Sequence, residues 1–255
     1  MIVKPMASEP TVVMIPARLR STRLPDKPLA EIGGVPMIVH VWRRACEAAV
    51  GPVIVACAEA AIAEAVEAHG GTGVLTDPDL PSGTDRIFQA LARVDPGRRF
   101  ARVINLQGDL PTLEPAAIRT VLEPLDQLGT DLGTLAVATE DPHEKADPNV
   151  VKAIIAFDPA RPRLGRALYF TRATAPSGDG PLYHHIGIYA FSREALERFA
   201  TLPPSPLERR ERLEQLRALE AGLSIGVALV DTNPLAVDTP DDLARARKEL
   251  AGRAV

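Results

Sequence analysis

The first half of the chain alternates short apolar runs with longer stretches in which apolar residues recur every three to four positions. The short runs predict β-strands and the periodic stretches predict helices. Such alternation is typical of right-handed β-α-β crossovers around a mainly parallel sheet. Strands are expected at residues 11–15, 52–56, 73–75, 101–106 and 132–138, and helices at residues 36–49, 59–69, 82–94 and 115–127.

The pattern changes after residue 139, where strand-like runs follow one another without a convincing helix between them. Turns rich in proline, glycine and aspartate separate these runs. The runs lie at residues 150–157, 167–171 and 184–191. We interpret residues 140–191, approximately, as a β-rich excursion that would suit a subunit contact or a second substrate.

The end of the chain returns to the α/β pattern. It predicts helices at residues 193–200, at 206–221 and from Pro240 onward, with a strand at 225–230. A length of 255 residues suits one large α/β domain or a domain with an embellishment. We therefore expect a single domain that spans residues 1–255.

The composition excludes several classes of protein. The net charge is −4 and hydrophobic residues make up 46% of the chain, so a basic face for general nucleic-acid binding is not expected. No run approaches the roughly 20 apolar residues of a membrane span, and no stretch near the start has the length of a signal-peptide core. The two cysteines lack metal-ligand spacing, which suits a reducing compartment. We expect a cytoplasmic protein with no nucleic-acid or membrane partner.

A cationic loop follows the first predicted strand and contains Arg18, Arg20, Arg23 and Lys27. In an open α/β sheet, ligands bind beyond the C-terminal ends of the strands, where this loop must lie. The four cations would repel one another unless an anion came to lie among them. Because the loop lacks the glycine patterns of the common phosphate-binding motifs, we expect its side chains to hold a triphosphate. A solvated basic turn is the alternative.

Two carboxylates are candidates for a metal site. Asp109 follows a buried strand and therefore lies at the same sheet edge as the cationic loop. Asp238 precedes Thr239, which can cap the last helix in a box with Asp242 and would leave Asp238 free. A carboxylate beside a triphosphate usually binds Mg²⁺. On local grounds alone, Gly108-Asp109 is also a good turn, and Asp238 is equally able to cap the helix.

Further polar groups lie at predicted helix starts. Ser82 and Asp85 are typical of a helix cap, although a helix N-terminus also suits a ribose or a phosphate. Glu208 can complete a capping box with Ser205. On one continuous helix, Glu208 and Gln215 would lie within about 20° of each other and share a face.

The β-rich excursion has its own set of polar side chains, which are Arg172, His184, His185 and Tyr189. A sugar acid would need such an arginine or histidine for its carboxylate. The alternative for the two histidines is one buried and one exposed ring on an alternating strand.

Together these segments resemble the 3-deoxy-manno-octulosonate (Kdo) cytidylyltransferase family. They follow one another in the family's order across nearly the whole chain, which makes the resemblance far more specific than a single motif. The segments are residues 15–29, 82–86, 105–111, 167–173, 184–191, 205–222 and 237–243.

The resemblance implies a nucleotide-diphospho-sugar-transferase-like α/β fold, with a mostly parallel sheet, flanking helices and a β-rich extension that forms a homodimer. It also implies an enzyme that transfers CMP from CTP to the anomeric hydroxyl of Kdo and releases pyrophosphate, with Mg²⁺ as cofactor. The product, CMP-Kdo, would serve lipopolysaccharide biosynthesis.

The resemblance also assigns roles to residues. Catalysis would depend on Arg18, Arg23, Lys27 and Asp109. The nucleotide would contact Ala17, Arg18, Ser21, Arg23, Lys27, Ser82, Thr84 and Gln107. The sugar would contact Arg172, His185, Tyr189, Glu208 and Gln215, and the metal would be held by Asp109 and Asp238.

The chain departs from the family pattern at several positions. Arg20 stands where many relatives have alanine, and the resemblance gives it no role; Asp26 stands where many have glycine. Because of such departures, a cytidylyltransferase for 8-amino-Kdo or a sialic acid is an alternative. A non-catalytic CTP sensor is the alternative from another class, but a sensor has less need of the paired carboxylates Asp109 and Asp238.

Overall fold

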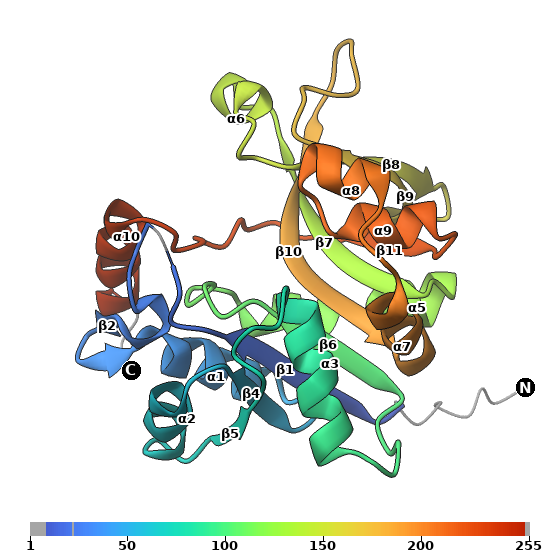
Figure 1. The fold of residues 1–255 in the computed structure, drawn as a ribbon. Coiled ribbons are helices and arrows are strands. Elements are labelled where there is room, and N and C mark those ends of the chain that lie inside the picture. Colours follow the sequence, from blue (N-terminus) through green and yellow to red (C-terminus); the bar gives the residue numbers. More distant parts are fainter. Residues whose placement is uncertain (1–8, 22, 253–255) are drawn as a thin grey trace, which may run out of the picture.

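One mixed sheet runs through the molecule (Figure 1). The structure is a computed structural model, which describes residues 9–21 and 23–252. Within these residues the sheet has nine strands in the order β5-β4-β1-β6-β10-β7-β11-β9-β8, and β2 and β3 form a separate hairpin. The strands are β1 (Thr11–Ala17), β2 (Glu31–Ile32), β3 (Val35–Pro36), β4 (Val53–Cys57), β5 (Thr72–Leu75), β6 (Arg102–Leu106), β7 (Leu132–Thr139), β8 (Lys152–Asp158), β9 (Arg161–Thr171), β10 (Leu182–Ser192) and β11 (Ile225–Leu229).

Helices cover both faces of this sheet. They are η1 (Lys27–Leu29), α1 (Met37–Ala48), α2 (Ala60–Glu67), α3 (Gly83–Val94), α4 (Pro115–Thr120), α5 (Glu123–Leu128), α6 (Pro142–Ala146), α7 (Arg193–Thr201), α8 (Pro206–Glu211), α9 (Gln215–Glu220) and α10 (Pro240–Ala251). None of the described helices is both long and apolar enough to cross a bilayer.

β1 lies between two of the three hydrophobic clusters that the described residues form. All seven of its residues are buried, which explains why the strand appears in the sequence as a continuous apolar run. Val13 and Ile15 pack in a core with α1, α2 and α4. Val12 and Met14 point to the other face and pack with α3, α7 and α9.

The sheet is parallel in its first part and mixed beyond it. β1 pairs in parallel with β4 and β6, and β4 pairs in parallel with β5. β10 then lies antiparallel between β6 and β7. In the second half only β7 and β11 pair in parallel among the described strands, so the expected mostly parallel sheet is found in the N-terminal half and the sheet as a whole is mixed. The predicted excursion of residues 140–191 therefore supplies a central strand as well as the β8–β9 hairpin.

Two predicted helices are each split in two. The predicted helix at 115–127 becomes α4 and α5, because Pro124 in the first turn of α5 cannot donate a helical hydrogen bond. The predicted helix at 206–221 becomes α8 and α9, because Arg212 adopts a left-handed conformation with φ 57°. The prediction that Glu208 and Gln215 share one helix face is therefore wrong. The short helix α6 was also not predicted.

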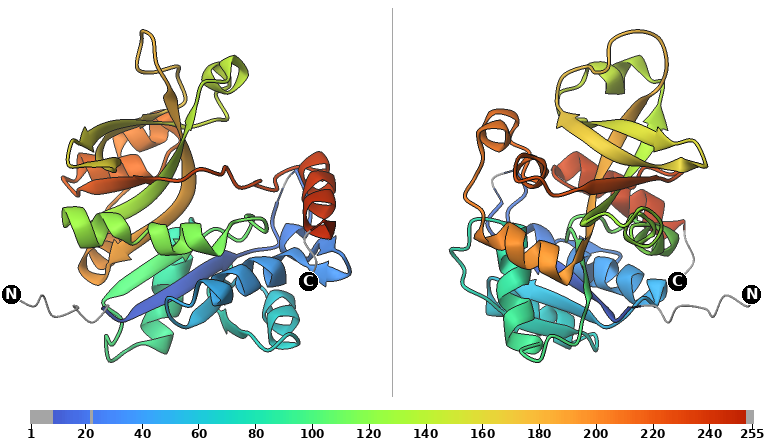
Figure 2. Two further views of the ribbon diagram at one scale, coloured as in Figure 1. Left: turned by 180° about the vertical axis from the view of Figure 1, so that it is seen from behind. Right: turned by 90° about the vertical axis from the view of Figure 1, so that its right-hand side faces the viewer.

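The segment between β11 and α10 crosses from the C-terminal half of the sheet to the β2–β3 hairpin. It extends across the molecule to α10, which packs beside β2 (Figures 1 and 2). Two hydrogen bonds from the backbone of this segment hold it in place. The N–H of Leu235 donates to Thr112 Oγ1 and the N–H of Val237 donates to the carbonyl of Asp109, both at 2.9 Å. The backbone of Asp109 thereby fixes the position of the neighbouring Asp238.

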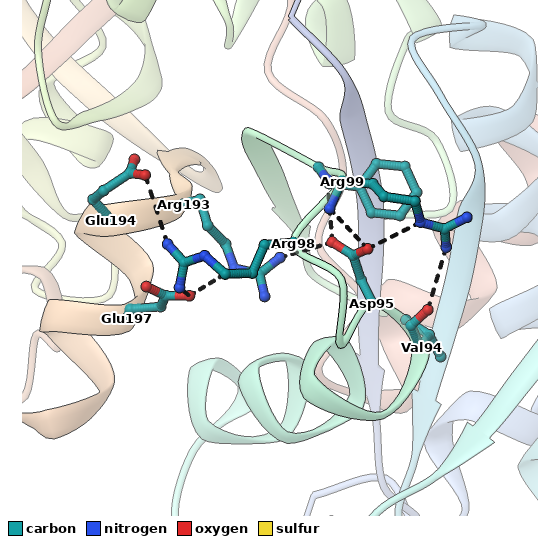
Figure 3. A network of polar contacts seen from close by, with 8 residues as sticks. Val94, Asp95, Arg98, Arg99, Arg193, Glu194 and Glu197 are labelled. Atoms are coloured by element: carbon teal, nitrogen blue, oxygen red, sulfur yellow. Dashed lines mark hydrogen bonds and ion pairs between the residues drawn. The ribbon is translucent and has the colours of Figure 1, made fainter.

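A buried carboxylate joins the end of α3 to α7 (Figure 3). Asp95 is fully buried and accepts the N–H groups of Arg99 and Phe100 at 3.0 and 3.1 Å and the Arg193 guanidinium at 2.9 Å. Burial alone would raise the pKa of Asp95, but these hydrogen bonds lower it from 3.8 to about 2. The ionised form therefore stabilises the fold.

We expect Asp95→Asn to lower the free energy of unfolding at pH 7 by about 1.5–3 kcal/mol, the usual contribution of hydrogen bonds to a buried charge. The folded-state pKa of Asp95 is depressed, so this contribution is complete above pH 4 and is lost as the pH falls toward 2. Urea denaturation at several pH values measures it. Asp231→Asn is the control, because its ion pair with Arg163 is exposed and should contribute less than about 0.5 kcal/mol. Equal losses in both variants would contradict the assignment.

Candidate active site

A cavity of about 730 Å³ lies at the C-terminal ends of β1 and β6, within the size range of small-molecule sites. The sequence predicted eight of its lining residues, which are Ala17, Arg18, Ser21, Arg23, Lys27, Ser82, Gln107 and Asp109. Arg20 and Arg86 also line it. Five cationic side chains therefore face a cavity whose lining contains one carboxylate, as an anionic ligand requires.

The cationic loop is shaped by local geometry. It leaves the end of β1 and re-enters regular structure at η1, where Asp26 adopts a left-handed conformation with φ 51°. Glycine adopts this conformation without strain and aspartate tolerates it, which explains how Asp26 can occupy this position. The N–H of Leu19 donates to Glu59 Oε2 at 2.9 Å and ties the loop to the segment before α2. Residue 22 of this loop lies outside the described residues.

The floor of the cavity is formed by close backbone packing. A Cβ at Gly108 would lie 3.0 Å from the carbonyl oxygen of Pro16, and one at Gly83 would lie 3.1 Å from the Pro16 ring. Both approaches leave little room for a side chain. The turn after β6 and the start of α3 therefore pack directly against the end of β1.

Lys27 forms the central contact of the site. Its Nζ donates to Asp109 Oδ2 at 2.9 Å and to Asp238 Oδ1 at 3.0 Å. Arg23 lies 3.1 Å from the other oxygen of Asp238. Burial lowers the pKa of Lys27, but Asp109 and Asp238 together raise it above its ordinary value, so the ammonium remains charged.

Asp109 and Asp238 are the two carboxylates of the site that could hold a divalent cation. They converge on a single cation, and Mg²⁺ commonly takes one or two carboxylates together with substrate phosphates. No cluster of three or more potential ligands among His, Cys, Asp and Glu occurs in the part of the chain that the structure describes. Thr239 caps α10 in a box with Asp242, as predicted. Asp238 therefore does not serve as the cap, and its two oxygens contact Lys27 and Arg23 instead.

Of the residues predicted to contact the nucleoside, Ser82 and Gln107 line the cavity and Thr84 does not. Ser82 caps α3 through a hydrogen bond from the Asp85 N–H at 3.1 Å and also lines the cavity. Thr84 is buried and does not line it; its hydroxyl donates to Glu214 Oε2 at 2.7 Å instead. Gln107 lines the cavity and donates to Asn105 at 3.1 Å, and Asn105 lies 3.4 Å from the Thr84 hydroxyl. A chain of hydrogen bonds thus connects the cavity to Glu214.

Sequence reasoning missed Glu214. Its Oε1 is the single buried side-chain oxygen or nitrogen without a hydrogen-bond partner among the described residues. Burial raises the pKa of Glu214, although hydrogen bonds from Thr84 and Ser82 oppose this. The predicted continuous helix gave Glu214 no distinct position, whereas the break after α8 places it at the start of α9. The one hint in the sequence was that Glu214 directly precedes Gln215, a predicted sugar contact.

A second cavity of about 540 Å³ shares Ser82 with the first. Glu214 lines it, together with Glu208, Arg209, Arg212 and Arg217. Glu208 itself is engaged in structure, because its Oε2 accepts the Ser205 N–H at 2.9 Å and Arg217 Nε at 2.8 Å. The predicted capping box of α8 is confirmed.

His185 and Tyr189 lie in the interior of the molecule. His185 Nε2 lies 2.9 Å from the Thr134 hydroxyl, and its ring packs against Phe170 and Tyr189. Burial lowers the pKa of His185 to about 3, so this ring is neutral at physiological pH. The expectation that a histidine would supply charge for a sugar carboxylate therefore does not hold for His185. Neither residue lines the two cavities described above.

Arg172 and Gln215 are the remaining predicted sugar contacts. The Arg172 guanidinium donates to the carbonyls of Glu211 and Pro148, both at 2.9 Å. Gln215 is buried at the first position of α9. The structure thus brings the predicted nucleotide and metal residues together, apart from Thr84, but it does not gather the five predicted sugar residues around one cavity.

Arg20 has a partner that the sequence did not reveal. Its guanidinium lies 3.4 Å from Asp79, and both side chains are more than three-quarters exposed. This ion pair connects the cationic loop to the segment before α3. Exposed pairs of this kind contribute little to stability.

Known proteins share this fold and sequence. A family profile described as "Cytidylyltransferase" matches residues 12–225. The 3-deoxy-manno-octulosonate cytidylyltransferase of Parvibaculum lavamentivorans is 63% identical over 252 residues, which cover 99% of this chain and 96% of that protein. The protein of the same name from Rhodospirillum centenum is 62% identical over 242 residues, which cover 95% and 94%.

A solved structure, that of CMP:2-keto-3-deoxy-manno-octonic acid synthetase complexed with CTP, matches with a TM-score of 0.87 and 37% identity. The match covers 96% of this chain and 100% of that one, and it confirms the predicted α/β nucleotidyltransferase-like fold. The extent of these likenesses, from β1 to the last helix, shows that the chain belongs to the 3-deoxy-manno-octulosonate cytidylyltransferase family.

Proposed function

We propose that this protein transfers CMP from CTP to the anomeric hydroxyl of Kdo and releases pyrophosphate. The observation that carries the proposal is the cavity that five cationic side chains line together with the carboxylate of Asp109, which Lys27 contacts. A triphosphate that carries a metal ion matches this arrangement of charge. The names of the relatives identify the base as cytosine and the acceptor as Kdo.

The reaction is an in-line displacement at the α-phosphorus of CTP. The Kdo hydroxyl oxygen forms the new bond to phosphorus, the bond to the pyrophosphate oxygen breaks, and the hydroxyl proton is lost to solvent or to a nearby base. Such transfers depend mainly on positioning and charge neutralisation. Arg18, Arg23 and Lys27 would hold the triphosphate and stabilise the charge that develops on pyrophosphate.

We propose Mg²⁺ as the cofactor, with Asp109 and Asp238 as its protein ligands. The donor set supports this choice, because two hard carboxylate oxygens suit a hard cation that keeps several waters. When bound, the ion would neutralise phosphate charge near the reacting centre. Gln107, which lines the cavity beside Asp109, would orient a substrate oxygen or a water there.

On the sugar side, we propose that Glu214 joins Arg172, His185, Tyr189 and Gln215 of the predicted set. Glu208 lines the same cavity as Glu214 but is held by Ser205 and Arg217, so we assign it a structural role. The Oε1 of Glu214 has no hydrogen-bond partner among the described residues and lies 3.9 Å from Arg217. It could accept a hydrogen bond from a hydroxyl, and Kdo has several hydroxyls. The neutral His185 is suited to hydrogen bonding, so Arg172 would provide the charge for the sugar carboxylate.

We also propose a cytoplasmic homodimer. Leu168 of β9 is 62% exposed, and β8 is the edge strand of the sheet, so a second copy could cover this part of the excursion. Cys46 and Cys57 are both free thiols, which suits a reducing compartment.

Pyrophosphate release from CTP and Mg²⁺ tests the function. We expect release with Kdo and at least tenfold lower kcat/KM with 8-amino-Kdo or a sialic acid as acceptor. Faster release with either alternative acceptor would reassign the substrate. Tight CTP binding without release for any acceptor would favour a CTP sensor.

Substitution of the metal carboxylates tests the catalytic assignment. We expect Asp109→Asn and Asp238→Asn each to lower kcat about 10²–10³-fold, the usual effect of losing one preorganised charged contact. Asp241→Asn removes an exposed carboxylate from the first turn of α10 and should change kcat less than threefold. Near-normal turnover of Asp109→Asn at ordinary Mg²⁺ would show that the metal assignment is wrong.

For the two glutamates that line the second cavity, we expect one substitution to affect sugar binding and the other to affect stability. Glu214→Gln should raise KM for the sugar about tenfold, because one hydrogen bond to a charged group is lost, and should leave stability nearly unchanged. Glu208→Gln should instead destabilise the fold by about 1.5–3 kcal/mol through the loss of its contact with Arg217. Steady-state kinetics and urea denaturation of both variants distinguish these roles. If only Glu208→Gln affected the sugar KM, the roles would be reversed.

A further inference from the structure

The ammonium of Lys27 lies where the carboxylates of Asp109 and Asp238 converge. Its two hydrogen bonds, of 2.9 and 3.0 Å, join residues that are 82 and 211 positions away in the chain. The Lys27 side chain is only 17% exposed. Without a cation between them the two carboxylates would repel each other, and Lys27 removes that repulsion.

A divalent cation would use the same carboxylate oxygens. Mg²⁺ binds oxygen ligands at about 2.0–2.1 Å, whereas the ammonium lies about 1 Å farther from each oxygen. The ammonium and the metal therefore cannot share this position, both for steric reasons and because both are positively charged.

We propose that Lys27 is the resident cation of the free protein and that it excludes the metal until a nucleotide triphosphate draws the ammonium onto its phosphates. Lys27 stays protonated and only changes partners, from carboxylates to phosphate oxygens. Metal and nucleotide then bind with positive coupling, and by linkage each raises the affinity for the other. This inference rests on the proposed function in one respect, namely that the site takes a metal-bound triphosphate.

The surrounding backbone allows this exchange without a rearrangement of the carboxylates. The Val237 N–H holds the carbonyl of Asp109, and the capping box of Thr239 and Asp242 fixes the residues next to Asp238. Lys27, in contrast, reaches the pair through a long flexible stem. Arg23 contacts only Oδ2 of Asp238, at 3.1 Å. Movement of the Lys27 side chain alone therefore frees Oδ2 of Asp109 and Oδ1 of Asp238, the two oxygens that it holds.

Direct metal binding tests the proposal. Mn²⁺, a paramagnetic substitute for Mg²⁺, is titrated into nucleotide-free protein while free Mn²⁺ is followed by electron paramagnetic resonance. We expect the unaltered protein to bind Mn²⁺ weakly and Lys27→Met to bind it at least tenfold more tightly. Addition of CTP should tighten Mn²⁺ binding at least tenfold in the unaltered protein and much less in Lys27→Met.

Two matched variants separate direct exclusion from a general effect of charge. Arg20→Met removes a cation from the same cavity, but Arg20 is paired with Asp79 and not with the metal carboxylates, so Mn²⁺ affinity should change less than threefold. Lys27→Arg keeps a cation at the position and should bind Mn²⁺ as weakly as the unaltered protein. Far-UV circular dichroism and urea denaturation establish that each variant is folded.

The proposal is overturned if Lys27→Met binds Mn²⁺ no more tightly than the unaltered protein, or if Arg20→Met gains as much affinity as Lys27→Met. These results are independent of the acceptor sugar. A protein with the expected Mn²⁺ behaviour but without pyrophosphate release from CTP and Kdo would retain the role of Lys27 and lose the proposed function.

Discussion

The contact of Lys27 with Asp109 and Asp238 is the interaction on which the active site depends. It joins the loop after β1, the turn after β6 and the segment before α10, which are far apart in the sequence. Each of these segments carries charge that would be unfavourable alone, since the loop is cationic and the two aspartates face each other. Their mutual neutralisation allows a polar cavity to form at the edge of an apolar sheet.

The strand order of the sheet brings these segments close together. Parallel pairing of β1 with β4 and β6 aligns their C-terminal ends, and β10 then continues the sheet in the opposite direction. Because β10 lies next to β6, residues of the β-rich excursion pack behind the nucleotide cavity. The hydrogen bonds from Gln107 through Asn105 and Thr84 to Glu214 connect the cavity to the start of α9.

Local chemistry explains where prediction from the sequence succeeded. The caps at Ser82, Ser205 and Thr239 depend on residues three positions apart, and the apolar run of β1 reports its burial directly. Prediction was wrong where a single residue changed the backbone direction. The left-handed conformation of Arg212 separates α8 from α9, and periodicity carries no sign of such a break.

The sequence by itself determined the cationic loop, the two carboxylates after their strands, the helix caps and, through its resemblance to a family, the chemistry of the site. These properties follow from residue type and short-range spacing. Only the tertiary structure decided that Lys27 bridges the carboxylates, that β10 makes the sheet mixed, that His185 is neutral and that Glu214 faces Thr84. These four features depend on contacts between residues far apart in the sequence or on burial. Local spacing specifies neither the contacts nor the burial.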